Sequence, residues 1–337
     1  MKNSHLITAG LGIGAASLWA SRRPPADLRN QVVLITGGSR GLGLALARKF
    51  GQLGCRIVIC ARHADQLEAA RENLLSYGIK ALAVPCDVSD QSQVDAMMSH
   101  VRDEFGPVDI LIANAGEMLV APLQDTTRED MERAMEVMFW GVVNPTLAVL
   151  PEMVARGAGR IAAITSIGGK VSVPHLVAYS CAKSAAVAFC EGLRAEMASS
   201  GISVTTIVPG LMRTGSHVNA RFKGNYRREA AWFSIAATAP AMSMSANRAA
   251  DQIVHAIRTG AAEKVLSTQA SILTRVQGLL PGLVPNLMSV VSTLLPSSTG
   301  DKTTVVRGLE LVRRQGRLLR FLTSAGRDAG RNLNQSA

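Results

Sequence analysis

The chain has 337 residues, of which 47% are hydrophobic and 18% are charged. It is long enough to bury a large core and too apolar for an intrinsically disordered protein. The formal charge is +11, but aromatic residues make up only 4% and no stacking pattern accompanies the basic residues, so we do not expect nucleic-acid binding. Many basic residues lie near the C-terminus, where they suit an anionic membrane surface or a solvated face: Arg307, Arg313, Arg314, Arg317, Arg320, Arg327 and Arg331.

The first 27 residues form a hydrophobic N-terminal segment. Its apolar part, Leu6 to Ala20, is short for a membrane span, which needs about 20 residues. One interpretation of this segment is the hydrophobic core of a signal peptide. We favour a short membrane anchor or an interfacial helix, and therefore expect a cytoplasmic protein that is associated with a membrane through this segment.

From residue 28 to residue 270, short β-branched apolar runs alternate with stretches of helical periodicity. This alternation predicts one α/β domain of the Rossmann type, a doubly wound parallel sheet with helices on both faces. The strands are expected within 31–36, 56–62, 80–90, 108–116, 160–169 and 202–210. The helices are expected within 44–54, 63–78, 91–106, 128–157 and 178–201. No cysteine pair has metal-ligand spacing, so we expect no metal site and read Cys60 and Cys86 as buried thiols.

A glycine-rich loop, "TGGSRGLG", joins the first expected strand to the first expected helix at 36–43. Glycines allow a sharp turn and a close approach of a pyrophosphate. The helix N-terminus that follows offers free N–H groups and a positive dipole end to an anion. A turn without a ligand is the alternative, but the strand before the loop and the helix after it favour a dinucleotide site.

The T-G-x-x-x-G-x-G spacing of this loop resembles that of the short-chain dehydrogenase/reductase family. Four further motifs support the resemblance: "CDVSD", "NAG" at 114–116, "YSCAK" and "PGLMRT". The resemblance implies a nicotinamide cofactor, with Asp87 near the adenine and the proline-glycine motif near the nicotinamide. The cofactor-binding residues that we expect are Thr36, Gly37, Ser39, Arg40, Gly41, Leu42, Gly43, Arg62, Asp87, Val88, Asn114, Ala115, Gly116, Tyr179, Lys183, Pro209, Gly210 and Thr214.

Two arginines point to NADP(H) as the cofactor. No acidic residue stands at the end of the second strand, where it would accept hydrogen bonds from a free ribose 2′-hydroxyl. Arg62 lies just past this end, and Arg40 lies in the glycine loop. Two guanidinium groups can fork around a 2′-phosphate, although either could be a solvated surface residue.

The catalytic residues expected from the resemblance are Ser166, Tyr179 and Lys183. Tyr179 and Lys183 are four residues apart on an expected helix and so share a face. A free phenol has a pKa of about 10, which a nearby ammonium group would lower. The resemblance implies that Tyr179 is the general acid/base, that Lys183 tunes it and holds the nicotinamide ribose, and that Ser166 donates a hydrogen bond to the substrate oxygen.

One position departs from the family pattern. The family often has an asparagine in the long helix, in a sequence such as V-N-x-x-G, and Met138 takes its place here in "VMFWG". A thioether donates no hydrogen bond and accepts only weakly, so the family's water relay to the lysine would need a substitute. Asn144 lies on another helical face, and we do not assign it this role.

The resemblance implies a carbonyl reductase or alcohol dehydrogenase with a substrate lid at about 211–245. The lid mixes basic and aromatic residues. It would suit a hydrophobic or lipid-like substrate, or its aromatic residues would simply pack on the body. The alternative function is a catalytically weak dinucleotide-binding regulator or scaffold. We expect a homo-oligomer, and the apolar and then basic extension at 271–337 to pack on the domain or on a membrane surface.

Overall fold

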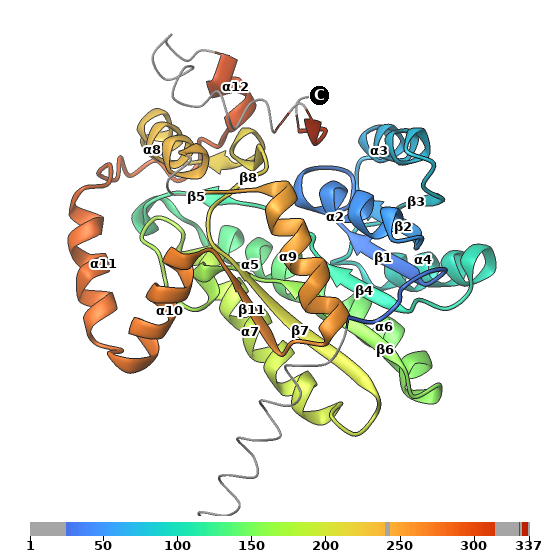
Figure 1. Ribbon diagram of the computed structural model, residues 1–337. Helices are drawn as coiled ribbons and strands as arrows, with labels where there is room; N and C mark the ends of the chain where they lie inside the picture. The colour runs from blue at the N-terminus through green and yellow to red at the C-terminus, as the bar shows by residue number, and fades with distance from the viewer. Residues whose placement is uncertain (1–24, 240–242, 314–329, 331, 336–337) are drawn as a thin grey trace, which may run out of the picture.

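The computed structural model describes residues 25–239, 243–313, 330 and 332–335. The expected anchor lies almost entirely outside these residues, as does most of the basic C-terminal stretch. The fold is built on a seven-stranded parallel sheet in the order β11-β7-β6-β4-β1-β2-β3 (Figure 1). Its strands are β1 (Val32–Thr36), β2 (Arg56–Ala61), β3 (Ala81–Pro85), β4 (Ile110–Ala113), β6 (Gly159–Ile164), β7 (Ile202–Pro209) and β11 (Glu263–Leu266).

Helices cover both faces of this sheet, which confirms the predicted fold class. Side chains alternate between faces along each strand, so that Val33 and Ile35 pack toward one layer while Val32 and Leu34 pack toward the other. The first layer contains α2 (Gly41–Gln52), α3 (Ala64–Ser76) and α9 (Ala246–Thr259). The second contains α4 (Gln91–Phe105), α6 (Gly141–Ala155) and α7 (Val177–Glu196).

The long expected helix at 128–157 is divided into three parts. They are α5 (Arg128–Met135), the π-helical turn η2 (Glu136–Trp140) and α6. Among the described residues, this stretch alone is long and apolar enough to cross a membrane, but 56% of its most apolar window is buried inside the protein. Packing in the core accounts for this hydrophobicity.

The lid folds over one end of the sheet. Its elements are β8 (Met212–Arg213), η4 (Ser216–Val218), β9 (Arg221–Phe222), α8 (Tyr226–Thr238) and β10 (Met244–Ser245). Phe222 and Phe233 are buried and contact edge to face, with ring centroids 6.1 Å apart. These two lid aromatics therefore pack inward, as one of the two readings predicted.

Four short elements complete the framework of the lid. The strands β5 (Leu119–Val120) and β12 (Val306–Arg307) flank β9 in a small three-stranded sheet. The 3₁₀ turn η1 (Leu123–Asp125) follows β5, and η3 (Ile167–Gly169) follows β6. The lid is thus tied to segments from both halves of the chain.

The extension after β11 begins with the helices α10 (Thr268–Leu279) and α11 (Leu283–Thr293), followed by α12 (Gly308–Arg313). In the main sheet, β2 and β3 lie on one side of β1 and β4 lies on the other. Open α/β sheets bind ligands in the crevice at such a point, outside the carboxyl ends of the strands. The crevice beyond β1 and β4 is therefore the expected site.

Candidate active site

The glycine loop and the "NAG" segment are fastened together at the carboxyl ends of β1 and β4. The Thr36 hydroxyl accepts hydrogen bonds from the N–H groups of Asn114 and Ala115, at 2.9 and 3.0 Å. In return, the Asn114 side-chain amide donates to the carbonyls of Thr36 and Gly37, at 3.0 and 3.2 Å. These bonds fix the loop before any ligand binds.

Two glycines of the loop are required by the geometry. Gly37 has φ of +64°, in the left-handed region that favours glycine. A Cβ atom at Gly43 would lie 2.3 Å from the Gly37 carbonyl oxygen. The N–H groups of Leu42 and Gly43, at the start of α2, have no acceptor in the part of the chain that the structure describes. This donor set fits the pyrophosphate of a dinucleotide.

A segment near the C-terminus lies on the same loop. The Leu333 carbonyl accepts a hydrogen bond from Gly41 N–H at 2.8 Å. Asn334 donates from its side chain to the Ser39 carbonyl at 3.0 Å, and the Asn219 side chain donates to Gln335 Oε1 at 2.6 Å. Sequence analysis gave no sign of this contact, because it joins residues almost 300 positions apart.

Deleting residues 334–337 is expected to tighten dinucleotide binding by about 3–10-fold. A hydrogen bond of this kind contributes about 0.5–1.5 kcal/mol, and a ligand that needs the loop must compete with the segment. The deletion keeps Leu333, which is buried in the core. Titration of the purified chain with NADPH measures the effect, and Asn334→Ala should act in the same direction but more weakly. Weaker binding after deletion would instead mean that the segment supports the cofactor.

The predicted NADP-selecting arginines lie in a cationic neighbourhood. Burial lowers the pKa of Arg40, and the nearby charges of Arg62 and Arg307 lower it further. The Arg40 guanidinium donates to side-chain oxygens of Gln66 and Asn219, at 3.1 and 3.0 Å. Because Arg62 and Arg307 repel the Arg40 guanidinium and its side-chain partners are neutral, an additional anion would stabilise Arg40.

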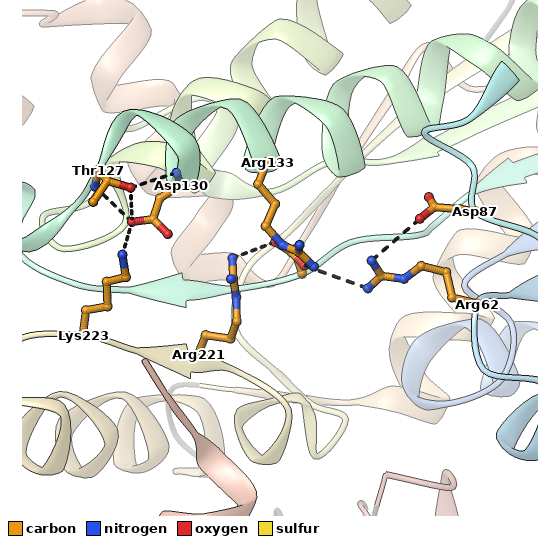
Figure 2. A network of polar contacts seen from close by, with 8 residues as sticks. Arg62, Asp87, Thr127, Asp130, Arg133, Arg221 and Lys223 are labelled. Atoms are coloured by element: carbon orange, nitrogen blue, oxygen red, sulfur yellow. Dashed lines mark hydrogen bonds and ion pairs between the residues drawn. The ribbon is translucent and has the colours of Figure 1, made fainter. Parts of the chain in front are cut away.

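Arg62 also belongs to a network of acidic and basic residues that the sequence did not indicate. It lies 3.9 Å from carboxylate oxygens of both Asp87 and Glu117 (Figure 2). Arg133 and Arg221 donate to the same Glu117 carboxylate, at 2.7 and 2.9 Å. Glu117 directly follows the "NAG" segment, so this network joins the cofactor crevice to α5 and to strand β9 of the lid.

The three expected catalytic residues meet beyond the carboxyl end of β6. Tyr179 and Lys183 share a face of α7, with Lys183 Nζ 6.0 Å from the centroid of the Tyr179 ring. The Ser166 hydroxyl accepts a hydrogen bond from Gly168 N–H at 3.0 Å, and the Tyr179 ring packs against Gly168, with its Cε1 atom 3.1 Å from the position that a Cβ atom would take there. A Cβ atom at Gly116 would lie 3.8 Å from Lys183 Nζ, so this lysine also borders the "NAG" segment.

The proton affinities of Tyr179 and Lys183 are set mainly by burial. Removal from water raises the pKa of Tyr179, and the hydrogen bond with Ser166 offsets this only partly. Burial also lowers the pKa of Lys183 to about 8. The expected lowering of the tyrosine pKa by the lysine is therefore not seen, because Lys183 Nζ donates to the Ile164 carbonyl at 2.7 Å instead of to the phenol.

Met138 occupies η2, the π-helical turn within the long helix, and is buried. Its Cγ atom lies 3.8 Å from the position that a Cβ atom would take at Gly116. Lys183 Nζ lies at the same distance from this position, so Met138 faces the crevice that Lys183 borders. Asn144 points elsewhere and donates to the carbonyls of Val88 and Ser89, at 3.0 and 3.1 Å. Asn144 therefore does not take the place of the family asparagine.

His175 lies in the loop between Ser166 and Tyr179 and has a structural partner. Its Nδ1 atom is 2.9 Å from a carboxylate oxygen of Glu229, a fully buried residue of α8. The Trp232 indole N–H donates to the same carboxylate at 2.7 Å. This arrangement ties the catalytic loop to the lid, and Glu229 is a further residue that sequence analysis missed.

The remaining expected residues lie around the same crevice. Pro209 ends β7 beside Leu266, and the Gly210 N–H donates to the Leu266 carbonyl at 3.3 Å. Thr214 is buried, with its Cβ atom 3.8 Å from the position of a Cβ atom at Gly41. The structure thus brings the glycine loop, "NAG", Ser-Tyr-Lys and proline-glycine segments to one edge of the sheet.

A Rossmann-type sheet with these four segments at one edge defines a nicotinamide-dinucleotide oxidoreductase. The short chain dehydrogenase family model matches residues 31–223. The chain therefore belongs to the short-chain dehydrogenase/reductase family, whose members act on CH–OH and C=O groups.

Individual relatives agree with this assignment. The chain is 39% identical over 216 residues to a dehydrogenase/reductase SDR family protein 7-like from Anopheles gambiae, a match that covers 63% of this chain and 68% of the relative. It resembles the actinorhodin polyketide ketoreductase solved with NADPH, with a TM-score of 0.65, 27% identity and coverage of 73% and 99% of the two chains. The chain also resembles a short-chain dehydrogenase/reductase from Burkholderia phymatum that was solved with NAD, with a TM-score of 0.71 and 22% identity. The match covers 77% of this chain and 96% of the other, and at this identity it supports the fold alone.

Proposed function

We propose that the protein is an NADP(H)-dependent oxidoreductase that interconverts a carbonyl group and an alcohol on a hydrophobic or lipid-like substrate. The observation that carries the proposal is the grouping of Ser166, Tyr179 and Lys183 beside Gly116, at the crevice that the glycine loop also borders. When bound, the nicotinamide supplies or accepts the hydride.

The chain's own residues handle the proton and the developing charge. In the direction of reduction, the Tyr179 hydroxyl gives its proton to the substrate oxygen, and its raised pKa keeps it protonated at neutral pH. The Ser166 hydroxyl donates a hydrogen bond to the same oxygen as negative charge develops there. We assign Lys183 to holding the nicotinamide ribose, because this lysine is buried and its Nζ atom borders Gly116 at the crevice.

Apolar side chains near the catalytic loop support a hydrophobic substrate. Met118, Leu176 and Trp232 are only partly buried and pack against the buried lid cluster around Phe222 and Phe233. They lie next to the segments that carry Glu117 and His175. A substrate chain could extend over these side chains while its carbonyl group reaches Tyr179.

The preference for NADP(H) rests on Arg40 and Arg62. Replacing Arg62 by alanine is expected to lower kcat/KM with NADPH by about 10–100-fold and to change kcat/KM with NADH little, because hydrogen bonds to a charged phosphate contribute about 1.5–3 kcal/mol. Initial rates with both cofactors measure this ratio. Arg71→Ala is the matched control, because Arg71 lies on α3 and pairs with Glu68. Equal losses with both cofactors would mean that Arg62 does not read the 2′-phosphate.

A catalytically weak dinucleotide-binding regulator is the second candidate function. Met138 favours it, because a buried thioether stands where many family members have a hydrogen-bonding asparagine. Oxidation of NADPH with a panel of ketones and aldehydes separates the two candidates. Turnover that depends on Tyr179 supports the enzyme, whereas tight NADPH binding without turnover on any compound supports the regulator.

A further inference from the structure

A basic pocket of about 600 Å³ lies at the edge of the sheet beside β11. Four cationic residues from four elements line it: Arg213 of β8, Arg248 of α9, Lys264 of β11 and Arg275 of α10. None of the cofactor-binding or catalytic residues named above lines it. The family's catalytic chemistry therefore does not explain why these charges gather here.

No aspartate or glutamate is among the described residues that line this basic pocket. The two acidic residues closest in sequence have other partners, since Glu263 pairs with Lys170 at 2.8 Å and Asp251 pairs with Lys49 at 2.7 Å. Arg213 is held in place by donating to the Ser243 hydroxyl at 3.1 Å. The hydroxyl groups of Ser245, Ser267 and Thr268 add neutral donors to the wall. The lining thus has the chemistry to hold a phosphate group.

An apolar surface adjoins the basic pocket. The helices α10 and α11 form a hairpin at the edge of the molecule away from α3 (Figure 1). Arg275 is the only charged residue between positions 265 and 300. Large apolar side chains of this hairpin are exposed, Leu279 by 80% and Leu294 by 81%. The others are Ile272, Leu280, Leu283, Leu287 and Val290.

We propose that the α10–α11 hairpin docks on an anionic phospholipid bilayer, with a lipid phosphate held in the basic pocket. Leucine side chains that are this exposed gain free energy when they enter the boundary between lipid headgroups and acyl chains. These four cations form no ion pair with an acidic residue that the structure describes, so an anionic headgroup would complement them. Arg275 on α10 links the pocket to the hairpin. A second copy that packed hairpin against hairpin would cover the leucines, but its hairpin has no acidic residue to pair with the four cations.

The test is hydrogen exchange on the full chain with vesicles, read out by mass spectrometry. A region-resolved readout is needed because the apolar stretch at residues 6–20 could bind vesicles by itself. Vesicles of phosphatidylcholine with phosphatidylglycerol are expected to protect residues 268–294 and 243–252, and vesicles of phosphatidylcholine alone are not. Equal protection on both vesicles would overturn the headgroup site.

Variants separate the charges from the leucines. The double variant Arg248→Gln with Lys264→Gln is expected to weaken partitioning of the hairpin onto anionic vesicles by about 10–30-fold, since each cation near such a surface contributes about 1 kcal/mol. Leu279→Ser with Leu287→Ser should abolish protection of the hairpin. Leu75→Ser is the matched control, because Leu75 is an exposed leucine of α3 and should change nothing. Unchanged protection in the charge variant would overturn the proposal.

Two further experiments test whether a soluble phosphate ester or a second copy of the chain occupies this surface instead of a lipid. Glycerol 3-phosphate without vesicles would protect the pocket residues 243–252 alone if the pocket serves a soluble phosphate ester, and that result would overturn docking on lipid. Protection of 268–294 that rises with protein concentration, without vesicles, would identify a second copy as the occupant. Thermal unfolding of each variant confirms that it is folded before its exchange is compared.

Discussion

Replacing Tyr179 by phenylalanine is expected to lower kcat for carbonyl reduction by about 10²–10⁴-fold, the usual contribution of a positioned general acid. The substitution removes the hydroxyl proposed as the proton donor and keeps the ring on α7. The dinucleotide loop is untouched, so the Kd for NADPH should stay close to that of the wild type. Stopped-flow oxidation of NADPH measures the chemical step, and fluorescence titration measures binding.

The control for this experiment is Tyr226→Phe. Tyr226 begins α8 in the lid and is partly buried, so it tests whether loss of any lid-side phenol has the same effect. We expect its kcat to remain near that of the wild type. If Tyr179→Phe retained full activity, the proton would have to come from another group, and the proposed catalytic role of Ser166 and Lys183 would lose its basis.

Replacing Lys223 by methionine is expected to lower the free energy of unfolding by about 3 kcal/mol. Lys223 is 4% exposed and donates to Asp130 at 2.5 Å and to the Lys302 carbonyl at 2.9 Å. Methionine fills a similar volume but leaves Asp130 buried without its cation, and removing one partner of a buried pair costs about 3–5 kcal/mol. Figure 2 shows this pair beside Thr127 at the start of α5. Urea unfolding followed by circular dichroism measures the loss.

The same substitution should change the response to acid. Burial raises the pKa of Asp130, but hydrogen bonding to Lys223 and to Thr127, together with the lysine charge, outweighs this and lowers it. A carboxyl group with a lowered pKa stabilises the fold at neutral pH and loses that contribution as the pH falls through the lowered value. Without Lys223 the pKa of Asp130 is lowered less, so the variant should lose less stability than the wild type as the pH falls.

Arg128→Met is the matched control for the stability experiment. Arg128 pairs with Glu132 on the exposed side of the same helix, with 85% of its side chain accessible. An exposed pair of this kind contributes little, so the control should unfold near the wild-type urea concentration. Equal stabilities for the two variants would show that the Lys223–Asp130 pair is not needed to hold the lid.

The sequence by itself determined the fold class, the glycine loop and the placement of Tyr179 and Lys183 on one helix face. Each of these depends on spacing along a short stretch: strands and helices have fixed periods, the loop needs glycine where a Cβ atom would clash, and Tyr179 and Lys183 share a face because they are four positions apart on a helix. Such constraints act locally, so they can be read without knowing what the rest of the chain does.

Only the tertiary structure decided which distant side chains meet. Glu117 contacts arginines from α5, from β9 and from the loop after β2, and Leu333 reaches the glycine loop from the other end of the chain. The raised pKa of Tyr179 and the lowered pKa of Lys183 also depend on how much water the surrounding elements exclude. Long-range pairing and burial are properties of packed surfaces, and no local period in the sequence encodes them.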